Sequence, residues 1–196
     1  MFGRIGGQKL ASIKTIKDDL AAAKEVYHLV ERGICGPYEF EDAITSIRTN
    51  IENTSFPFVD KELIRIEKIR GGIIEAATQV TEFYEYFRKL ESVISKIQDT
   101  LIAYGMTEES DYLSMLISSE YHGIQSEEQL KIIIDEANWQ ISKLVAAGAF
   151  YDYRPIECGH IIHIYRDSCM AYERLKLHLL EYIDILQHHQ NRFDEF

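Results

Sequence analysis

The stretch from Tyr153 to Cys169, YRPIECGHIIHIYRDSC, gathers side chains that could do chemistry into one short part of the chain. It contains two of the three cysteines and two of the seven histidines, together with acidic residues and two arginines. Histidine and carboxylate side chains bind metal ions, and histidines also serve as general acids and bases. These residue types therefore raise two hypotheses, a metal centre and a catalytic centre.

The metal hypothesis depends on Glu-x-x-His pairs, formed by Glu25 with His28 and by Glu157 with His160. This spacing resembles that of carboxylate-bridged di-iron bundles, in which both ligands project inward from one helix face. Helical phase places Glu157 near the core side but His160 about 90° away from it. His163 lies three residues after His160, on the flank or the polar side. We therefore expect no metal or other cofactor, with Glu157, His160 and His163 as the alternative metal ligands.

The catalytic hypothesis depends on Arg154 and His160, which are separated by five residues. This spacing resembles the Arg-x(4–6)-His motif that HEPN-type ribonucleases, an all-α family, carry on their last helix. The resemblance implies that Arg154 would bind the phosphate and that His160 would act in acid–base chemistry. Pro155 departs from the family pattern, which usually has a polar residue after the arginine. The alternative function is therefore a HEPN-like ribonuclease or a metal or redox helical bundle that uses the 154–163 region, with Arg154, Glu157 and His160 as the alternative catalytic residues.

Hydrophobic periodicity predicts that helices position all of these residues. From Ile66 to Tyr104, apolar residues recur at alternating steps of three and four, which is the heptad pattern of a packed or coiled-coil seam. The pattern stays in phase across Gly71-Gly72, so it predicts one helix over 60–104. The same reasoning, with Ser126 and Gln129 as a capping box and Pro155 in a first turn, predicts five more helices. They cover 13–33, 39–52, 107–121, 126–148 and 156–190.

No segment of useful length alternates with period two, so we predict no sheet. The fold class is therefore all-α, an elongated antiparallel helical bundle of four long helices plus two short connecting helices. We expect a single domain over 1–196, in which residues 1–9 are flexible. The apolar seams indicate that no polar constellation points inward. An apolar seam that extends past its shorter neighbours needs cover, so we expect a homo-oligomer.

The net charge of −11 does not provide the basic footprint that nucleic-acid binding requires. A basic group on the predicted helix over 60–104 is interpreted as a solvated face; it consists of Lys61, Arg65, Lys68 and Arg70. An acidic surface suits a basic protein partner. We therefore expect a protein partner and no nucleic-acid partner.

Targeting features and cysteine usage indicate where the chain works. No apolar stretch approaches the ~20 residues that span a membrane, and no signal peptide is evident, so we expect no membrane association. Cys35, Cys158 and Cys169 form no Cys-x-x-Cys pair. They are predicted to be free thiols in a reducing compartment, which indicates a cytoplasmic protein.

Aromatic residues outside the seams are candidates for partner binding, because tyrosine is favoured at the centres of interfaces. Helical phase places Tyr84 and Tyr86 away from the core, and Phe150, Tyr151 and Tyr153 fall in a predicted connector. The preferred function is therefore a non-enzymatic helical-bundle protein that acts by protein–protein contact. Such a protein would be an adaptor, a structural subunit, an inhibitor or an immunity-type protein.

Overall fold

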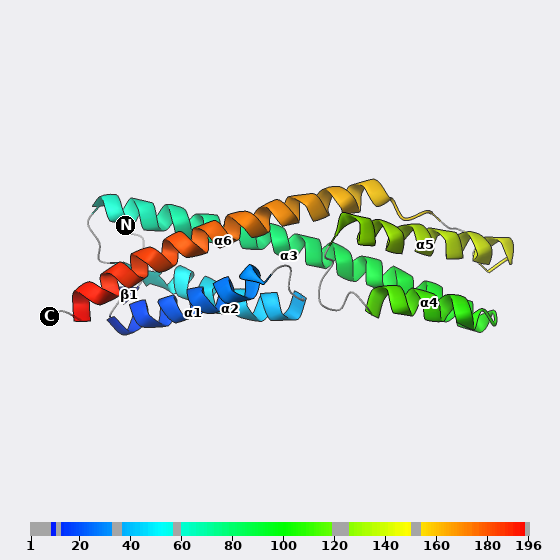
Figure 1. The fold of residues 1–196 in the computed structure, drawn as a ribbon, viewed down its shortest axis with the longest axis horizontal. Coiled ribbons are helices and arrows are strands. Elements are labelled where there is room, and N and C mark those ends of the chain that lie inside the picture. Colours follow the sequence, from blue (N-terminus) through cyan, green and yellow to red (C-terminus); the bar gives the residue numbers. More distant parts are fainter. Residues whose placement is uncertain are drawn as a thin grey trace, which may run out of the picture. The chain divides into compact units, whose positions relative to one another are not determined.

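The computed structural model describes residues 9–10, 13–32, 37–56, 60–118, 126–149 and 154–194. Within them the chain forms six helices, which confirms the all-α prediction (Figure 1). They are α1 (Ile13–Glu31), α2 (Pro37–Asn53), α3 (Asp60–Ala103), α4 (Thr107–Ser118), α5 (Glu127–Ala146) and α6 (Cys158–Asp194). None of these helices combines the length and the apolar character that a membrane crossing requires.

The described β structure is one short parallel pairing, between β1 (Lys9–Leu10) and β2 (Thr54–Ser55). Each strand has two residues, so the pairing is too short to produce an alternating sequence pattern. Residues 1–9 were predicted to be flexible, and the structure describes only the last of them, Lys9. Residues 1–8 lie outside the described part of the chain, whereas Lys9 pairs with Thr54.

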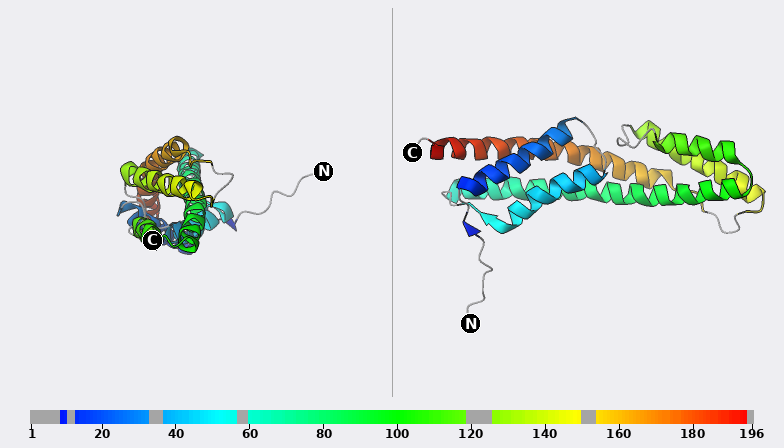
Figure 2. Two further views of the ribbon diagram at one scale, coloured as in Figure 1. Left: turned by 90° about the vertical axis from the view of Figure 1, so that its right-hand side faces the viewer. Right: turned by 90° about the horizontal axis from the view of Figure 1, so that it is seen from below.

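The helices pack as two compact units. Unit 1 contains the described residues up to Thr78 and those from Ala171 onward, and unit 2 runs from Gln79 to Met170. Each unit therefore combines a helical hairpin, α1–α2 or α4–α5, with parts of α3 and α6. Within each unit, consecutive helices run antiparallel (Figures 1 and 2). The single-domain organisation and the elongated arrangement of four long helices stay predictions.

The two shorter helices are integral members of these units, although the sequence suggested that they were connectors. α2 buries Phe40, Ile44 and Ile47, and α4 buries Leu113. Apolar burial of this kind stabilises a helix mainly through its packing, because an isolated helix of this length is marginal in water. Both helices therefore depend on the units in which they pack.

Helix α3 passes through Gly71 and Gly72 without a break, as predicted. Its apolar seam is buried as predicted except at its last member, Tyr104, which is 50% exposed; the buried members are Ile66, Ile69, Ile73, Ala76, Val80, Phe83, Phe87, Leu90, Ile94, Ile97 and Leu101. The helix ends in a Schellman motif. Gly105, with φ +76°, donates to the carbonyl of Ile102, and Met106 donates to that of Leu101. The predicted stop at Gly105 thus follows from a left-handed conformation that glycine adopts without strain.

The two glycines inside α3 have different surroundings. A Cβ at Gly72 would lie 2.5 Å from Nε2 of His178 on α6, whereas a Cβ at Gly71 would meet nothing within 4 Å. Gly72 therefore leaves room for the His178 ring of α6 against α3 within unit 1.

Replacing each glycine with alanine tests this difference. Gly71→Ala should raise the free energy of unfolding by roughly 1 kcal/mol, because alanine is the better helix former. Gly72→Ala gains the same propensity but displaces the His178 ring, and such overpacking costs about 1–3 kcal/mol. Urea denaturation of both variants should therefore find Gly72→Ala the less stable. Equal stabilisation would show that the approach to His178 imposes no constraint.

Candidate functional site

The segment before α6 lies at the surface of unit 2. α6 begins at Cys158, so Pro155 precedes the helix and does not occupy its first turn. Glu157 is exposed. The prediction that Glu157 faces the core is wrong, because its helical phase was extended to residues that precede the helix. Asn138 of α5 fixes this segment instead, since its Oδ1 accepts from Ile156 N at 2.8 Å and its Nδ2 donates to Ile156 O at 3.2 Å.

The histidines that follow do not assemble into a metal centre. His160 and His163 are both exposed, and Nε2 of His163 lies 3.6 Å from Oδ2 of Asp167. Across the described ranges, no group of three or more His, Cys, Asp or Glu side chains is placed to hold a metal ion. The alternative ligands Glu157, His160 and His163 are therefore surface residues, which agrees with the helical phase of the two histidines.

The motif of the HEPN-type ribonucleases would require Arg154 and His160 to lie on one helix, and they do not. Arg154 is exposed and lies before α6. His160 is also exposed, and it lies in the first turn of α6. The His160 ring contacts Tyr86 of α3 edge to face, with centroids 5.4 Å apart, and Lys89 Nζ lies 4.9 Å from the Tyr86 centroid. The structure thus joins a residue predicted for catalysis with one predicted for partner binding.

The other aromatic candidates have different outcomes. Tyr84 is only 2% exposed, and its ring lies 5.7 Å from that of Phe83. Its predicted position outside the core is wrong, because the buried surface of α3 is wider than the heptad seam and includes the neighbour of Phe83. Phe150, Tyr151 and Tyr153 lie outside the described residues.

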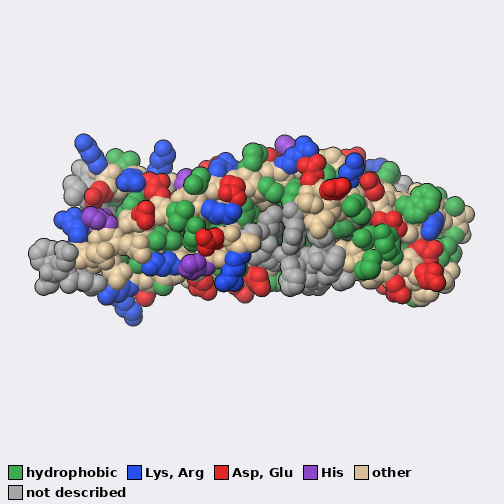
Figure 3. Space-filling model, viewed as in Figure 1, with side chains coloured by type: hydrophobic (Ala, Val, Ile, Leu, Met, Phe, Trp, Pro, Cys, Tyr) green, Lys and Arg blue, Asp and Glu red, His purple; other side chains and the backbone are tan. Residues whose placement is uncertain are grey.

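Large apolar side chains are exposed on α4 and α5, a feature that the sequence reasoning missed. Their exposed fractions are 44% for Tyr112, 56% for Met115, 47% for Ile132 and 59% for Trp139. Ile132 and Trp139 are seven residues apart and therefore lie on one stripe of α5, opposite its buried side. These four residues are called the α4/α5 face. Hydrophobic and acidic side chains are interspersed over α4 and α5 in Figure 3.

An ion pair shows how the two halves of this face meet. Lys143 Nζ of α5 lies 3.3 Å from Glu109 Oε1 of α4, and it also lies 5.8 Å from the Trp139 ring centroid. Tyr112 follows Glu109 by one turn, and Trp139 precedes Lys143 by one turn. α4 and α5 run antiparallel (Figures 1 and 2). Moving one turn forward along α4 and one turn back along α5 therefore leads in the same direction, so Tyr112 and Trp139 flank the same level of the junction. The aromatic side chains on the two helices thus belong to one surface.

The surroundings of the α4/α5 face are acidic. The two helices carry seven carboxylates against two lysines, a net charge of −5. The exposed carboxylates nearest in sequence to the apolar residues are Glu108, Asp111, Glu128 and Asp135. The pKa of Glu109 is lowered by a backbone hydrogen bond at its own residue and by Lys143. The carboxylates around the face therefore favour cationic groups.

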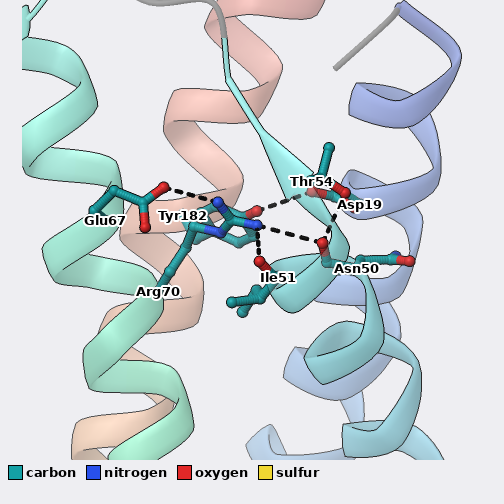
Figure 4. Close-up of polar contacts among 7 residues, drawn as sticks. All are labelled: Asp19, Asn50, Ile51, Thr54, Glu67, Arg70 and Tyr182. Atoms are coloured by element: carbon teal, nitrogen blue, oxygen red, sulfur yellow. Dashed lines mark hydrogen bonds and ion pairs between the residues drawn. The ribbon is translucent and has the colours of Figure 1, made fainter. Parts of the chain in front are cut away.

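Unit 1 contains a different feature, a buried pair between α1 and α6. Asp19 and Tyr182 have no exposed surface, and the Tyr182 hydroxyl donates to Asp19 Oδ2 at 3.0 Å (Figure 4). Burial raises the pKa of Asp19, although the Tyr182 hydrogen bond and the charge of Arg70 act in the opposite direction. Burial and the neighbouring Asp19 charge raise the pKa of Tyr182. Asp19 Oδ1 has no hydrogen-bond partner among the described residues.

Arg70 of α3 is buried beside this pair, with 2% of its surface exposed. Its Nη1 donates to Glu67 Oε1 at 2.8 Å, and its Nη2 donates to the carbonyls of Asn50 and Ile51 near the end of α2 (Figure 4). The guanidinium also lies 5.2 Å from the Phe56 ring centroid. Arg70 therefore donates to carbonyls near the end of α2, where the helix itself provides no donors; the carbonyl of Asn50 also accepts from the Thr54 hydroxyl at 2.7 Å.

These contacts correct two expectations from the sequence. Arg70 does not belong to a solvated face, and the interior of unit 1 does contain an inward polar group. The arrangement links α1 to α6 through a buried hydrogen bond and α2 to α3 through partly buried ones. We assign it a structural role, because its polar atoms are enclosed by the helices that they connect.

The geometry therefore separates a surface suited to binding, the α4/α5 face, from a buried polar group that orders unit 1. Comparisons of the chain with protein-family models, with curated proteins and with solved structures find no match.

Proposed function

We propose that the chain is a non-enzymatic protein-interaction module that binds another protein through the α4/α5 face. It would act as an adaptor, a structural subunit, an inhibitor or an immunity-type protein. The observation that carries the proposal is the exposure of Trp139, 59%, on a helix whose opposite side is buried. Tryptophan and tyrosine are enriched among the residues that contribute most to protein–protein binding.

The energetics of covering Trp139 support this role. A partner that covered the indole would remove on the order of 100 Å² of apolar surface from water, which is worth about 2.5 kcal/mol. Tyr112, Met115 and Ile132 would add further apolar area around it. Contiguous exposed apolar residues within a charged surround are typical of interaction sites.

The surrounding charges favour a partner other than a second copy of the chain at this face. Pairing the α4/α5 face with itself would bring carboxylates of both copies together, which is unfavourable. The homo-oligomer expected from the sequence would therefore use another surface. Cys158 and Cys169 are free thiols, which fits the cytoplasmic location that we propose.

Binding of the natural partner by surface variants tests the proposal. The wild-type protein, tagged and recovered from cells that produce it, should retain a partner that Trp139→Ala loses. With the purified partner, calorimetry should find the Kd raised about 30-fold or more, the effect of truncating a residue worth about 2 kcal/mol.

Leu177→Ala provides the matched control, because Leu177 is also an exposed large apolar residue but lies on α6 in unit 1. It should bind as the wild type does, and both variants should keep the wild-type circular dichroism spectrum. Unchanged binding by Trp139→Ala, or an equal loss with Leu177→Ala, would reject the α4/α5 face as the binding surface.

A further inference from the structure

We propose that the part of the partner that binds the α4/α5 face is a basic amphipathic helix. This inference rests on the proposed function and specifies the chemistry of the partner. It combines two observations, the arrangement of the apolar residues along two antiparallel helices and the excess of carboxylates among them.

The apolar arrangement favours a helix over an extended peptide. Peptides that bind as strands add to the open edge of a sheet, and α4 and α5 offer no such edge. Two antiparallel helices with Tyr112 and Trp139 flanking their junction instead present apolar side chains against which the apolar face of a partner helix can pack. Ile132 and Trp139 are about 10 Å apart along α5, two helical turns. A partner helix with apolar residues at i, i+3, i+4 and i+7 presents contacts at the same repeat.

The charges specify the polar side of that helix. Glu128 and Asp135 are exposed near Ile132 and Trp139 on α5, and Glu108 and Asp111 are exposed near Tyr112 on α4. The two lysines of these helices offset only part of this charge, and Lys143 already pairs with Glu109. Lysine or arginine residues beside the partner's apolar stripe would therefore approach carboxylates from both helices, which speeds association and excludes acidic partners.

Synthetic peptides of about 18 residues, five turns of helix, test the inference directly. One carries leucines at i, i+3, i+4 and i+7 with lysines elsewhere. A second replaces every lysine with glutamate, and a third has the lysine peptide's composition in scrambled order. Trp139 is the sole tryptophan of the chain, so its fluorescence reports contact at this face. The lysine peptide should shift the emission to shorter wavelength and saturate, while the other two should not.

Charge-neutral variants separate a specific site from general attraction to an acidic protein. Glu128→Gln with Asp135→Asn should raise the Kd of the lysine peptide about three- to tenfold at low salt. Glu75→Gln with Asp42→Asn removes the same charge from exposed positions in unit 1. This double variant should change the Kd of the lysine peptide less than twofold. The difference should shrink as salt rises from about 0.1 M to 1 M, because the Debye length falls from ~10 Å to ~3 Å.

Several results would overturn the inference. They are equal binding of the glutamate or scrambled peptide, no binding of the lysine peptide, and equal weakening by the unit 1 charge variant. Concentration-dependent self-association that buries Trp139 would identify a second copy as the occupant instead. If the lysine peptide fails but Trp139→Ala still loses the natural partner, the basic helix is wrong and the proposed function stands.

Discussion

Replacing Arg70 with alanine should lower the free energy of unfolding by about 3–5 kcal/mol, the usual result of removing one partner of a buried charged group. The variant loses the hydrogen bonds to Glu67 and to the carbonyls of Asn50 and Ile51. It also leaves space beside Phe56 and removes the positive charge that favours ionised Asp19. Urea denaturation followed by circular dichroism would measure the loss.

Arg65→Ala is the matched control, because Arg65 belongs to the same helix and forms an ion pair with Glu181 at 2.8 Å. Both side chains of that pair are largely exposed, so its loss should cost no more than about 1 kcal/mol. A similar destabilisation by the two substitutions would show that Arg70 is not the buried link between α2 and α3 that the structure describes.

Replacing Tyr182 with phenylalanine should cost about 1.5–3 kcal/mol at neutral pH, because a buried carboxylate loses its hydrogen-bond donor. The cost should fall on acidification. Burial raises the pKa of folded Asp19 above 3.8, so folding takes up a proton between that value and the raised pKa. In this window Asp19 adds stability as the pH falls. Without the Tyr182 donor its pKa rises further, so the variant recovers more stability than the wild type.

The Asp19→Asn background isolates this titration. Asparagine carries no charge in this range, so in that background the cost of Tyr182→Phe should become independent of pH between about pH 7 and pH 4. Other carboxylates titrate equally in every variant and cancel in the comparison. A Tyr182→Phe effect that remained pH-dependent in the Asp19→Asn background would assign the titration to another group.

Much of the local structure could be predicted because it depends on short-range patterns. The seam across Gly71-Gly72 predicted a continuous α3, and Ser126 accepts from the backbone N–H of Gln129 at 3.1 Å as a helix cap. Gly105 ends α3 through its left-handed conformation. Each feature involves residues within a few positions of one another, so the local sequence contains the information that determines it.

The buried polar group was missed because its residues look like ordinary surface residues in the sequence. Asp19 lies three residues after Ile16 and four before Ala23, so it shares the buried side of α1 with these two apolar residues. The partner of Asp19, Tyr182, is 163 residues away. Only the packing of α1 against α6 shows that this carboxylate has a buried donor.

The proposed binding surface has one feature that is visible in the sequence. Trp139 lies between Ala137 and Ile141 of the buried stripe of α5, yet it points to the opposite side. A large aromatic residue on the polar side of an amphipathic helix is a candidate for partner binding, because tryptophan is favoured at the centres of interfaces. The pairing of this surface with Tyr112 of α4 depends on the Lys143–Glu109 contact, which no local pattern predicts.

Fluorine NMR of Trp139 tests the proposed binding surface most directly, since 5-fluorotryptophan gives a single resonance in a chain with one tryptophan. In the free protein, the resonance should show the solvent isotope shift of an indole in contact with water. Titration with the purified natural partner should shift the resonance and abolish that solvent sensitivity. A resonance that stays unshifted and solvent-sensitive when the partner is saturating would contradict binding at the α4/α5 face.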